Sequence, residues 1–358
     1  MTQTPKISII MSVYNGQDYL EEAIDSVLQQ SFRDWELIVI NDCSTDNTKE
    51  ILERYAAKDS RIRVYTNDVN LRLPASLNKA MSYASGKYIA RMDADDICLP
   101  DRLEKQYAFM EGHPDVALSS CRFLTLKNGM IASGGGGGRC DGESLKSRLL
   151  VANPILHPGV IAKTEVIRSL GYDPRFTCTE DLELWTRFVM NGHKVQIQPA
   201  YLIIYRLHDK QITATTLERQ HQEVLKIQKI YYTKFLQPMT SDQEQFYITG
   251  IYFKENITSN QFCRFHRWIQ SVNRKNRAVS PDKISYAMLE VFAEYKRKGI
   301  SAAELIRCLL SFNPVFLLRE SVERKKRLQA DGYKCIEAAG KIGLKQIGGT
   351  LACPVFSK

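Results

Sequence analysis

Four apolar runs alternate with segments of helical periodicity over the first hundred residues, and this alternation constrains the fold more than any other feature. The runs are KISIIMSVY, WELIVIND, RIRVY and KYIARM. Each is short, rich in β-branched or aromatic residues, and typical of a buried strand. Strands separated by single helices form βαβ units. The pattern therefore predicts an α/β fold with a parallel sheet covered on both faces.

The pattern changes after Pro114. Residues 116–126 alternate and end at Asn128-Gly129, which predicts a hairpin or a strand antiparallel to the sheet. A helix is expected over 179–190, short strands follow to Arg206, and the remainder is mostly helical. We predict an α/β domain over 1–215, with halves at about 1–112 and 113–215, and a helical region over 216–358.

Charge divides the chain in the same way. The net charge is +9, but from residue 201 onward 26 Lys and Arg face 14 Asp and Glu, whereas the first 200 residues carry 23 and 26. A basic C-terminal region suits nucleic acid, an anionic membrane surface or an acidic polymer. The region lacks a nucleic-acid-binding signature, which argues against that class. No G-x-G-x-x-G follows the first strand, which argues against a dinucleotide oxidoreductase.

Cysteine usage and hydropathy bear on the compartment. The nine cysteines form no C-x-x-C pair, so neither a zinc site nor a disulfide framework is indicated, and reduced thiols in the cytosol are expected. No stretch reaches the roughly 18 apolar residues of a membrane-spanning helix. We expect a cytoplasmic protein that is soluble or peripheral on the membrane.

Polar residues gather where the predicted parallel strands end. Ser12 and Tyr14 end the first strand, Asp42 ends the second, and the acidic segment DADD, residues 93–96, follows the fourth. Ligands of open parallel sheets bind beyond these carboxyl ends. An aromatic face, a carboxylate and a cluster of oxygen ligands together suit a nucleoside diphosphate with a metal ion on its phosphates.

Structural alternatives exist for each feature. Tyr14 suits a turn, and Asp42 suits a helix cap or an Asx turn. The DADD segment is harder to explain structurally, because Arg91 is the only cation nearby before Arg102, and local ion pairing does not account for the crowding. A bound Mg²⁺ or Mn²⁺ would relieve the repulsion. The glycine run 134–138 is typical of a mobile loop, and it lacks the Lys-Ser/Thr that ends a phosphate-binding P-loop.

A second group of candidates lies further along the chain. His157 precedes Pro158, and Glu180 and Asp181 open the predicted helix at 179–190. Acids at a helix start also stabilise its dipole. Trp185, four residues after Asp181, is expected to form an aromatic wall that desolvates this acid and raises its basicity. His208 follows an apolar strand, where a lone histidine is more often structural than a ligand.

These segments together resemble the family 2 glycosyltransferases. The resemblance rests on SIIMSVYNGQDYLEEAIDSVLQQSFRDWELIVINDCSTDNT, GKYIARMDADDICLPDRLEKQ, NPILHPGVIAK and TEDLELWTRF…YRLHDKQIT, in this order, and covers about residues 5–215. It implies a GT-A fold, a Rossmann-like mixed sheet, in a metal-dependent, inverting enzyme that uses nucleotide sugars. The first half of the domain would then bind the nucleotide sugar, and the second half the acceptor.

The resemblance also implies residue roles. Ser12 and Tyr14 match positions beside the nucleoside, Asp42 the carboxylate that reads uracil, Asp93 and Asp95 the ends of the DxD motif, and Asp96 an acid facing the donor sugar or ribose. Asp95 and His208 match metal-site positions, and Asp181 matches the catalytic base. The implied nucleotide-sugar set is Ser12, Tyr14, Asp42, Arg72, Asn78, Asp93, Ala94, Asp95 and Asp96, and the implied acceptor set is His157, Glu180 and Trp185.

Two departures from the family pattern bear on the donor pocket and on the number of sugars that the enzyme adds. The segment NLRLPASLN places Arg72 and Pro74 where relatives have small residues, so Arg72 is expected to add a phosphate contact. The QxxRW signature of processive synthases is absent, which favours a single-addition enzyme. The resemblance implies a hexosyl- or N-acetylhexosaminyltransferase that uses a UDP-sugar and Mn²⁺ or Mg²⁺. The alternative is a catalytically inactive sugar-nucleotide-binding scaffold.

The acceptor is expected to be a glycan or a lipid-linked oligosaccharide of a bacterial capsule or lipopolysaccharide. In the C-terminal region, residues 312–329 place an apolar cluster ahead of the basic run 324–327. This pattern predicts an interfacial helix on anionic lipid at the inner face of the cytoplasmic membrane, or equally a packed helix with a solvated basic face.

Overall fold

Strand β1 (Ile7–Val13) lies inside a parallel sheet, as its unbroken apolar run predicts. It pairs in parallel with β2 (Trp35–Asn41) on one side and with β4 (Tyr88–Arg91) on the other, and β3 (Ile62–Thr66) extends the sheet beyond β2. In this register Val13 lies opposite Asn41, and Ile10 lies opposite Arg91. The loops after β1, β2 and β4 therefore leave the same edge of the sheet.

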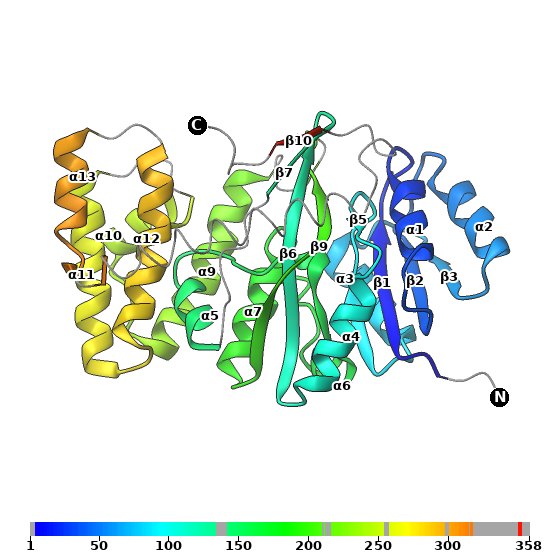
Figure 1. The fold of residues 1–358 in the computed structure, drawn as a ribbon, viewed down its shortest axis with the longest axis horizontal. Coiled ribbons are helices and arrows are strands. Elements are labelled where there is room, and N and C mark those ends of the chain that lie inside the picture. The colour runs from blue at the N-terminus through cyan, green and yellow to red at the C-terminus, as the bar shows by residue number, and fades with distance from the viewer. Residues whose placement is uncertain are drawn as a thin grey trace. The chain divides into compact units, whose positions relative to one another are not determined.

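The chain forms two compact units. The computed structural model describes residues 4–133, 142–209, 211, 216–253, 258–297, 301–314, 316–317 and 350–352. The first unit contains residues 1–139, 155–215 and 330–358, and the second contains 140–154 and 216–329. Figure 1 shows the strands of the first unit in blue, cyan and green, apart from a short strand at 350–352, which is red. The glycine run 134–138 and the basic run 324–327 lie outside the described residues.

The other strands of the first unit turn the parallel sheet into a mixed one. β8 (Ile161–Lys163) is antiparallel to β4, and β6 (Val116–Lys127) is antiparallel to β8. The predicted hairpin is present, because β6 turns into β7 (Met130–Ser133) at Asn128 and Gly129, whose φ angles are 49° and 73°. The remaining strands are β9 (Lys194–Arg206), which pairs with β5 (Ile97–Cys98) and β6, and β10 (Thr350–Ala352), which pairs with β7.

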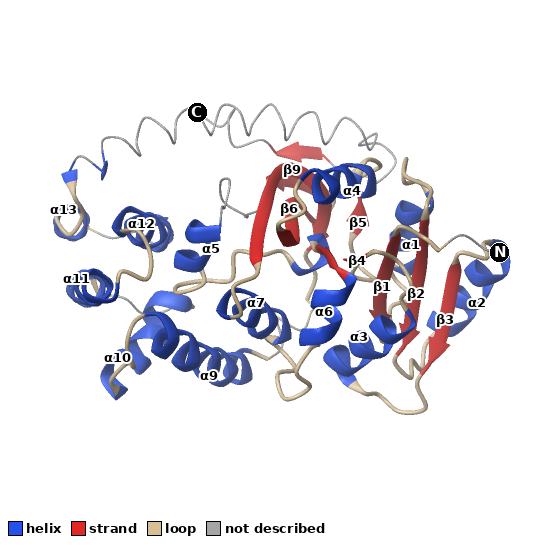
Figure 2. Cartoon of the chain, turned by 90° about the horizontal axis from the view of Figure 1, so that it is seen from below, coloured by secondary structure: helices blue, strands red, loops and turns tan. Residues whose placement is uncertain are grey.

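Helices cover both faces of this sheet. Figure 2 shows α3 and α6 on one face and α1 and α4 on the other. The helices of the first unit are α1 (Leu20–Leu28), α2 (Thr48–Lys58), α3 (Arg72–Tyr83), α4 (Arg102–Gly112), η1 (His157–Gly159), α6 (Thr164–Leu170) and α7 (Glu180–Met190). The apolar stripes predicted from the sequence face the sheet: Leu20, Ala23, Ile24 and Val27 of α1 are buried.

Buried hydrogen bonds connect α4 to the edge of the sheet at which the parallel strands end. The Arg102 side chain is fully buried, and it donates from Nη2 to the Arg91 carbonyl at 2.6 Å and from Nε to Gln106 at 3.0 Å. Gln106 in turn donates to the Gly159 carbonyl at 2.7 Å. A buried guanidinium is stabilised only when such acceptors surround it. The link therefore fixes the end of β4 relative to η1.

The second unit is helical, as predicted for the region after residue 215. Its helices are α5 (Gly142–Arg148), α9 (Leu217–Phe235), α10 (Ser241–Phe246), the π-helical turn η2 (Tyr247–Tyr252), α11 (Ser259–Asn276), α12 (Pro281–Arg297) and α13 (Ala302–Leu309). The sequence division at residue 215 left 140–154 in the α/β domain. These residues instead belong to the helical unit, where Tyr232 donates to the Leu150 carbonyl at 2.9 Å and Arg148 pairs with Glu290.

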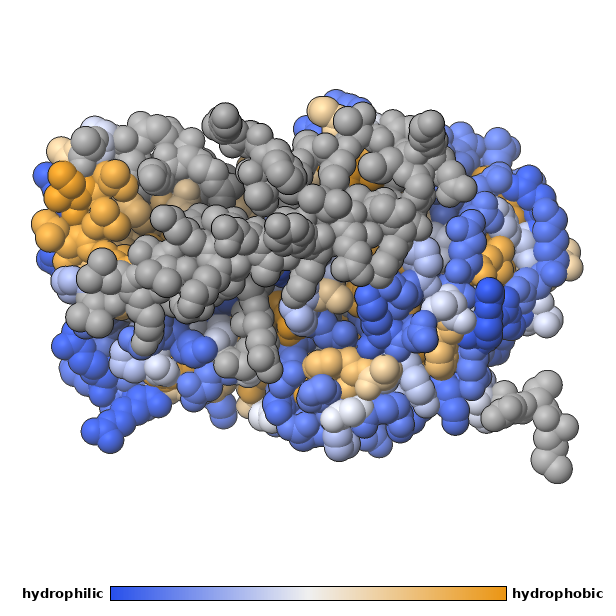
Figure 3. All heavy atoms as spheres, viewed as in Figure 1, coloured by the Kyte–Doolittle hydropathy of each residue, from blue (hydrophilic) through white to orange (hydrophobic). Residues whose placement is uncertain are grey.

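The second unit also exposes apolar side chains. Ile306 is 58% exposed and Leu310 is 77% exposed, and Figure 3 shows hydrophobic residues gathered over α13. None of the described helices is both long enough and apolar enough to cross a membrane.

The close approach of Gly86 to β1 predicts an asymmetry between two glycine-to-alanine substitutions. A Cβ on Gly86 would lie 2.6 Å from the Ser8 backbone nitrogen and 2.9 Å from the Ile7 carbonyl carbon. We expect Gly86→Ala to lower the free energy of unfolding by about 2 kcal/mol in urea denaturation, because backbone atoms must move.

Gly112→Ala is the matched control. It ends α4 and has no atom within 4 Å of the added Cβ, so the free energy of unfolding should rise by about 0.5 kcal/mol. Equal midpoints for Gly86→Ala and the wild type would contradict the close packing of β1 on residue 86.

Candidate functional site

Two cavities open beyond the carboxyl ends of the parallel strands. The larger cavity, about 330 Å³, lies beside the ends of β1 and β2, and the smaller cavity, about 260 Å³, lies beside η1 and the start of α7. Leu73, Asp93, Asp95 and Gln211 line both cavities. The two spaces therefore meet at the acidic segment that follows β4.

The larger cavity contains most of the residues predicted to bind a nucleotide sugar. Its lining includes Ser12, Tyr14, Asp42, Arg72, Asp93, Ala94 and Asp95, together with His208. Tyr14 is 53% exposed, so its ring is available to a ligand. Since a planar base binds on an aromatic face, an exposed ring at the edge of a polar cavity suits a nucleoside.

The Asp42 carboxylate is fixed by hydrogen bonds from other segments and does not cap a helix. It is buried, and its Oδ1 accepts hydrogen bonds from Asn67 Nδ2 and from the Leu71 backbone N–H, both at 2.8 Å. Lys79 orients Asn67 by donating to its Oδ1 at 2.6 Å. Asn67 and Lys79 were not predicted from the sequence, because their polar roles depend on the pairing of β2 with β3 and on the packing of α3.

Strained backbone surrounds the larger cavity. Asn15, Cys43 and Arg72 have φ angles of 52°, 62° and 71°, which L-residues rarely adopt. Two of these residues, Asn15 and Arg72, line the cavity itself. Such strain persists where surrounding contacts hold the loop, and it is frequent at binding sites.

The three acids after β4 have different partners, which corrects the expectation that ion pairing does not account for them. Their ligand oxygens lie within 4.8 Å of one another. Arg91, whose side chain is 2% exposed, forms an ion pair with Asp93. Asp95 Oδ2 lies 2.9 Å from His208 Nε2, and Asp96 Oδ1 accepts from the Arg206 backbone N–H at 2.9 Å. Each of the three acids therefore has a partner of its own, and these partners reduce the repulsion among the acids.

Asp96, which the resemblance implied to face the donor sugar or ribose, does not line the larger cavity. Its side chain is fully buried and lines neither of the two cavities. Burial and the neighbouring carboxylates of Asp93 and Asp95 raise the pKa of Asp96 well above its ordinary value. Through its hydrogen bond from the Arg206 N–H, Asp96 anchors the end of β9.

Asp95 and His208 form the part of the site that fits a divalent cation. Both side chains line the larger cavity, and both remain partly exposed, at 29% for Asp95 and 17% for His208. The other ring nitrogen of His208, Nδ1, is buried and has no hydrogen-bond partner among the described residues, and Nε2 is the one presented to Asp95. A carboxylate oxygen and an imidazole nitrogen at one point are suitable ligands for a transition-series divalent ion.

The smaller cavity contains a second acidic group. Glu180 and Asp181 open α7 and line this cavity with His157. Burial, together with the charge of Asp181, raises the pKa of Glu180 to about 8. Glu180 is therefore mostly protonated at neutral pH.

His157 is a neutral hydrogen-bonding residue of this cavity. Burial, and to a lesser degree the charge of Arg91, lowers its pKa well below the ordinary value. Its Nε2 lies 2.8 Å from the Tyr172 hydroxyl, and its Nδ1 lies 3.7 Å from Glu180 Oε1. The contact with Glu180 is therefore one between two neutral groups.

Trp185 and Asn78 line neither of the cavities that their predicted roles would require. Trp185 is fully buried, packs edge-on against the His157 ring at 5.7 Å, and lines neither cavity. It is a core residue, because its buried ring packs against the rings of His157 and Phe188. Asn78 also lines neither cavity, since its amide bonds the Tyr172 backbone N–H and carbonyl, each at 2.8 Å.

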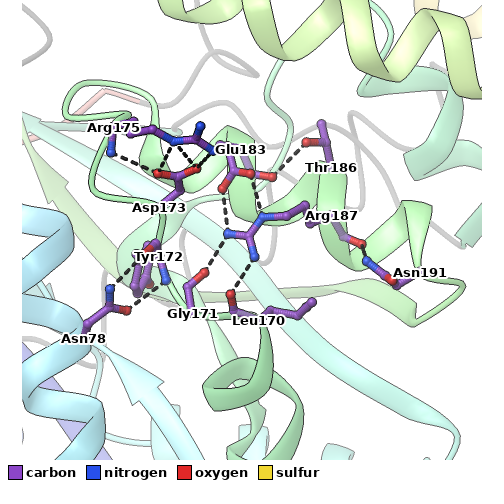
Figure 4. Close-up of polar contacts among 10 residues, drawn as sticks. All are labelled: Asn78, Leu170, Gly171, Tyr172, Asp173, Arg175, Glu183, Thr186, Arg187 and Asn191. Carbon is purple, nitrogen blue, oxygen red and sulfur yellow. Dashed lines mark hydrogen bonds and ion pairs between the residues drawn. The ribbon is translucent and has the colours of Figure 1, made fainter.

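Asn78 belongs to a set of contacts that fixes the segment before α7. Figure 4 shows Asn78 beside Tyr172, and the Arg187 guanidinium between Glu183 and the carbonyls of Leu170 and Gly171. These bonds hold Tyr172 against His157. No local sequence pattern predicts these bonds, because Asn78 and Tyr172 are 94 positions apart.

The sequence of this chain is similar to those of known proteins. The profile of the family described as Glycosyl transferase family 2 matches residues 8–129. An uncharacterized glycosyltransferase of Methanocaldococcus jannaschii is 33% identical over 219 residues, which are 60% of this chain and 76% of that protein. The Escherichia coli protein WfgD, a UDP-Glc:alpha-D-GlcNAc-diphosphoundecaprenol beta-1,3-glucosyltransferase, is 42% identical over 214 residues, 58% of this chain and 79% of that one.

Solved structures show the same fold. S. aureus TarS 1–349 in complex with UDP-GlcNAc has a TM-score of 0.56 and 17% identity, covering 83% of this chain and 93% of that one. The mannosyltransferase PcManGT of Pyrobaculum calidifontis, in complex with GDP-Man and Mn²⁺, has a TM-score of 0.50 and 17% identity, covering 95% and 87%. The chain belongs to family 2 of the glycosyltransferases and has the GT-A fold followed by a helical region.

The positive φ of Arg72 predicts that glycine stabilises this position. Arg72→Gly should raise the free energy of unfolding by about 0.5–1 kcal/mol in urea denaturation, because glycine adopts the left-handed region without steric cost. Arg72→Ala, which removes the same side chain and keeps the strain, is the control and should bring no gain. Equal stabilities of the glycine and alanine variants would contradict the left-handed backbone.

Glu180 predicts a pH dependence of stability. With a pKa of about 8 in the folded protein and 4.5 as the ordinary value, Glu180 keeps its proton while the unfolded chain loses it. The free energy of unfolding therefore falls as the pH rises from about 4.5 to 8. We expect Glu180→Gln to flatten this slope in urea denaturation at pH 5, 6, 7 and 8.

Glu53→Gln is the control for this experiment. Glu53 lies exposed on α2 and pairs only at the surface with Lys49 at 3.8 Å, so its removal should leave the slope unchanged. A Glu180→Gln slope identical to that of the wild type would rule out a protonated Glu180 at neutral pH.

Proposed function

We propose that the protein transfers a single sugar from a UDP-sugar to a hydroxyl group of a glycan or lipid-linked oligosaccharide, with inversion at the anomeric carbon. The observation that carries this proposal is the meeting of the two cavities at Asp93 and Asp95. A donor in the larger cavity and an acceptor in the smaller one would then face each other across the acidic segment.

In the donor half, Tyr14 stacks on the base, and Asp42, held by two hydrogen bonds, accepts a base N–H. Ser12 lies beside the nucleoside, and Arg72 contacts the diphosphate. The UDP-GlcNAc bound by TarS and the UDP-Glc in the name of WfgD support a UDP-sugar donor. A uracil base suits this cavity, because uracil carries an N–H donor that the Asp42 carboxylate can accept.

Asp95 and His208 are the proposed metal ligands. Their mixed oxygen and nitrogen donor set favours Mn²⁺ over Mg²⁺, since Mg²⁺ strongly prefers oxygen. The Mn²⁺ in the PcManGT complex supports this proposal. When bound, the cation neutralises charge on the diphosphate leaving group. The Asp93–Arg91 ion pair keeps Asp93 out of this ligand set and directs it to the shared edge of the cavities.

In the acceptor half, Asp181 is the proposed base. Its Oδ1 accepts the Leu182 N–H at 2.6 Å, which fixes the carboxylate at the start of α7. Glu180, protonated, and His157, neutral, can hydrogen-bond acceptor hydroxyls without competing for the proton. Asp181 accepts the proton of the attacking hydroxyl while the bond to the diphosphate breaks. A single displacement of this kind converts a UDP-α-sugar into a β-linked product.

The biological setting that we propose is the assembly of a bacterial surface polysaccharide, such as a capsule or O-antigen. The undecaprenol-linked acceptor in the name of WfgD supports a lipid-linked oligosaccharide. An acceptor of this kind would place the enzyme at the inner face of the cytoplasmic membrane.

Substitution of the two key acids separates metal binding from proton transfer. With Mn²⁺ and a panel of UDP-sugars, we expect one donor to turn over and to release UDP. Asp181→Ala should lower this rate by about 10²–10⁴-fold, the contribution typical of a general base, and should retain Mn²⁺–UDP binding in calorimetry. Asp95→Ala should lose both turnover and metal-dependent UDP binding.

Asp115→Ala is the control, because Asp115 is exposed and pairs at the surface with Lys194. It should match the wild type in both assays. Turnover that is indifferent to chelation of the metal, or an α-linked product, would contradict the proposal.

A further inference from the structure

Arg206, at the end of β9, contacts the acidic segment at two points. Its backbone N–H donates to Asp96 Oδ1, and its Nε donates to the Asp95 carbonyl, both at 2.9 Å. Its Nη2 pairs with Glu22 in the first turn of α1. The side chain is only 14% exposed, so the guanidinium is fixed by these partners rather than by solvent. Arg206 thus connects β9, α1 and the segment after β4.

Tyr19 extends this connection to the second metal-site residue. The Arg206 guanidinium carbon lies 4.6 Å from the centre of the Tyr19 ring, in a cation–π contact. The Tyr19 ring also packs on the His208 imidazole, with centroids 5.0 Å apart and planes inclined by 37°. The ring therefore lies between Arg206 and His208. One guanidinium contacts the backbone of Asp95 directly and reaches His208 through a single aromatic ring.

We propose that Arg206, with Glu22 and Tyr19, is a positioning residue that holds Asp95 and His208 at the geometry required by the divalent cation. The inference rests on the metal site proposed above. Arg206 is not itself a ligand, because a guanidinium is a cation without an acceptor atom. Its Nε donates to the Asp95 carbonyl, and its Nη2 pairs with Glu22. Its effect is to fix where two ligands, 113 residues apart in sequence, present their atoms.

The guanidinium is suited to this role by its shape. Its planar fork donates to two acceptors at once while its face lies on an aromatic ring, and a lysine ammonium cannot do all three. The ion pair with Glu22 adds little by itself, since Glu22 is 40% exposed and such pairs are screened by solvent. The functional consequence is therefore expected in the affinity for the metal rather than in stability.

The test measures Mn²⁺ affinity in the presence of saturating UDP, by electron paramagnetic resonance titration. Arg206→Ala should weaken Mn²⁺ binding by about 10-fold or more, the effect typical of residues that orient metal ligands. Binding of UDP in the presence of a chelator should stay close to that of the wild type, because the base-binding residues Tyr14 and Asp42 are not contacted by Arg206. Arg206→Lys should recover only part of the lost affinity.

Arg54→Ala is the matched control. Arg54 forms an ion pair at the surface with Glu21, the residue before Glu22 in α1. The substitution therefore removes the same charge beside the same helix without changing a contact of the proposed metal site. Its Mn²⁺ affinity should equal that of the wild type. If Arg206→Ala fails to fold, as judged by circular dichroism, Arg206→Lys provides the measurement, since it keeps the charge and loses the fork.

Three outcomes would overturn the inference. The first is wild-type Mn²⁺ affinity in the folded Arg206 variant. The second is an equal loss of Mn²⁺ binding and of chelator-treated UDP binding, which would indicate general damage. The third is the absence of Mn²⁺ binding in the wild type with UDP present, which would remove the proposed metal site as well. A wild type that binds Mn²⁺ together with an unaffected variant rejects this inference alone.

Discussion

Three carboxyl groups within 4.8 Å of one another at the end of β4 impose the constraint on which the rest of the site depends. In a partly buried setting their repulsion is too large to stand uncompensated. The fold compensates it from three directions, through the buried Arg91, the backbone N–H of Arg206 and the imidazole of His208. Each partner engages one acid, so three residues adjacent in sequence acquire three different roles.

The compensation also connects the site to the core. Arg102 is fully buried and donates to the carbonyl of Arg91. The backbone of Arg91, the residue that pairs with Asp93, is therefore itself fixed by a residue of the core. On the other side, Asn78 and Arg187 hold the segment that carries Tyr172 against His157. Both cavities are therefore bordered by backbone that the packed interior keeps in place. A preformed site of this kind needs little reorganisation when a ligand binds.

The position of the larger cavity could be predicted from the sequence, because ligands bind beyond the carboxyl ends of parallel strands. The individual side-chain contacts were predicted less accurately. Ser12, Tyr14 and Asp42 line it because parallel strands deliver their carboxyl ends to one edge, which periodicity alone predicts. Asp96 and Trp185 were misplaced, since their positions depend on which way a side chain turns once β9 and the sheet pack beside it. A motif gives the residues of a site, and packing selects among them.

The sequence by itself determined the alternation of strands and helices, the mixed sheet, the helical second unit and the family, because hydrophobic periodicity and motif spacing are local properties of the chain. Only the tertiary structure decided that Asp93 pairs with Arg91, that Asp95 meets His208, and that residues 140–154 join the helical unit. These outcomes depend on register and long-range packing. A side chain with several possible partners takes the one that the folded backbone brings within reach.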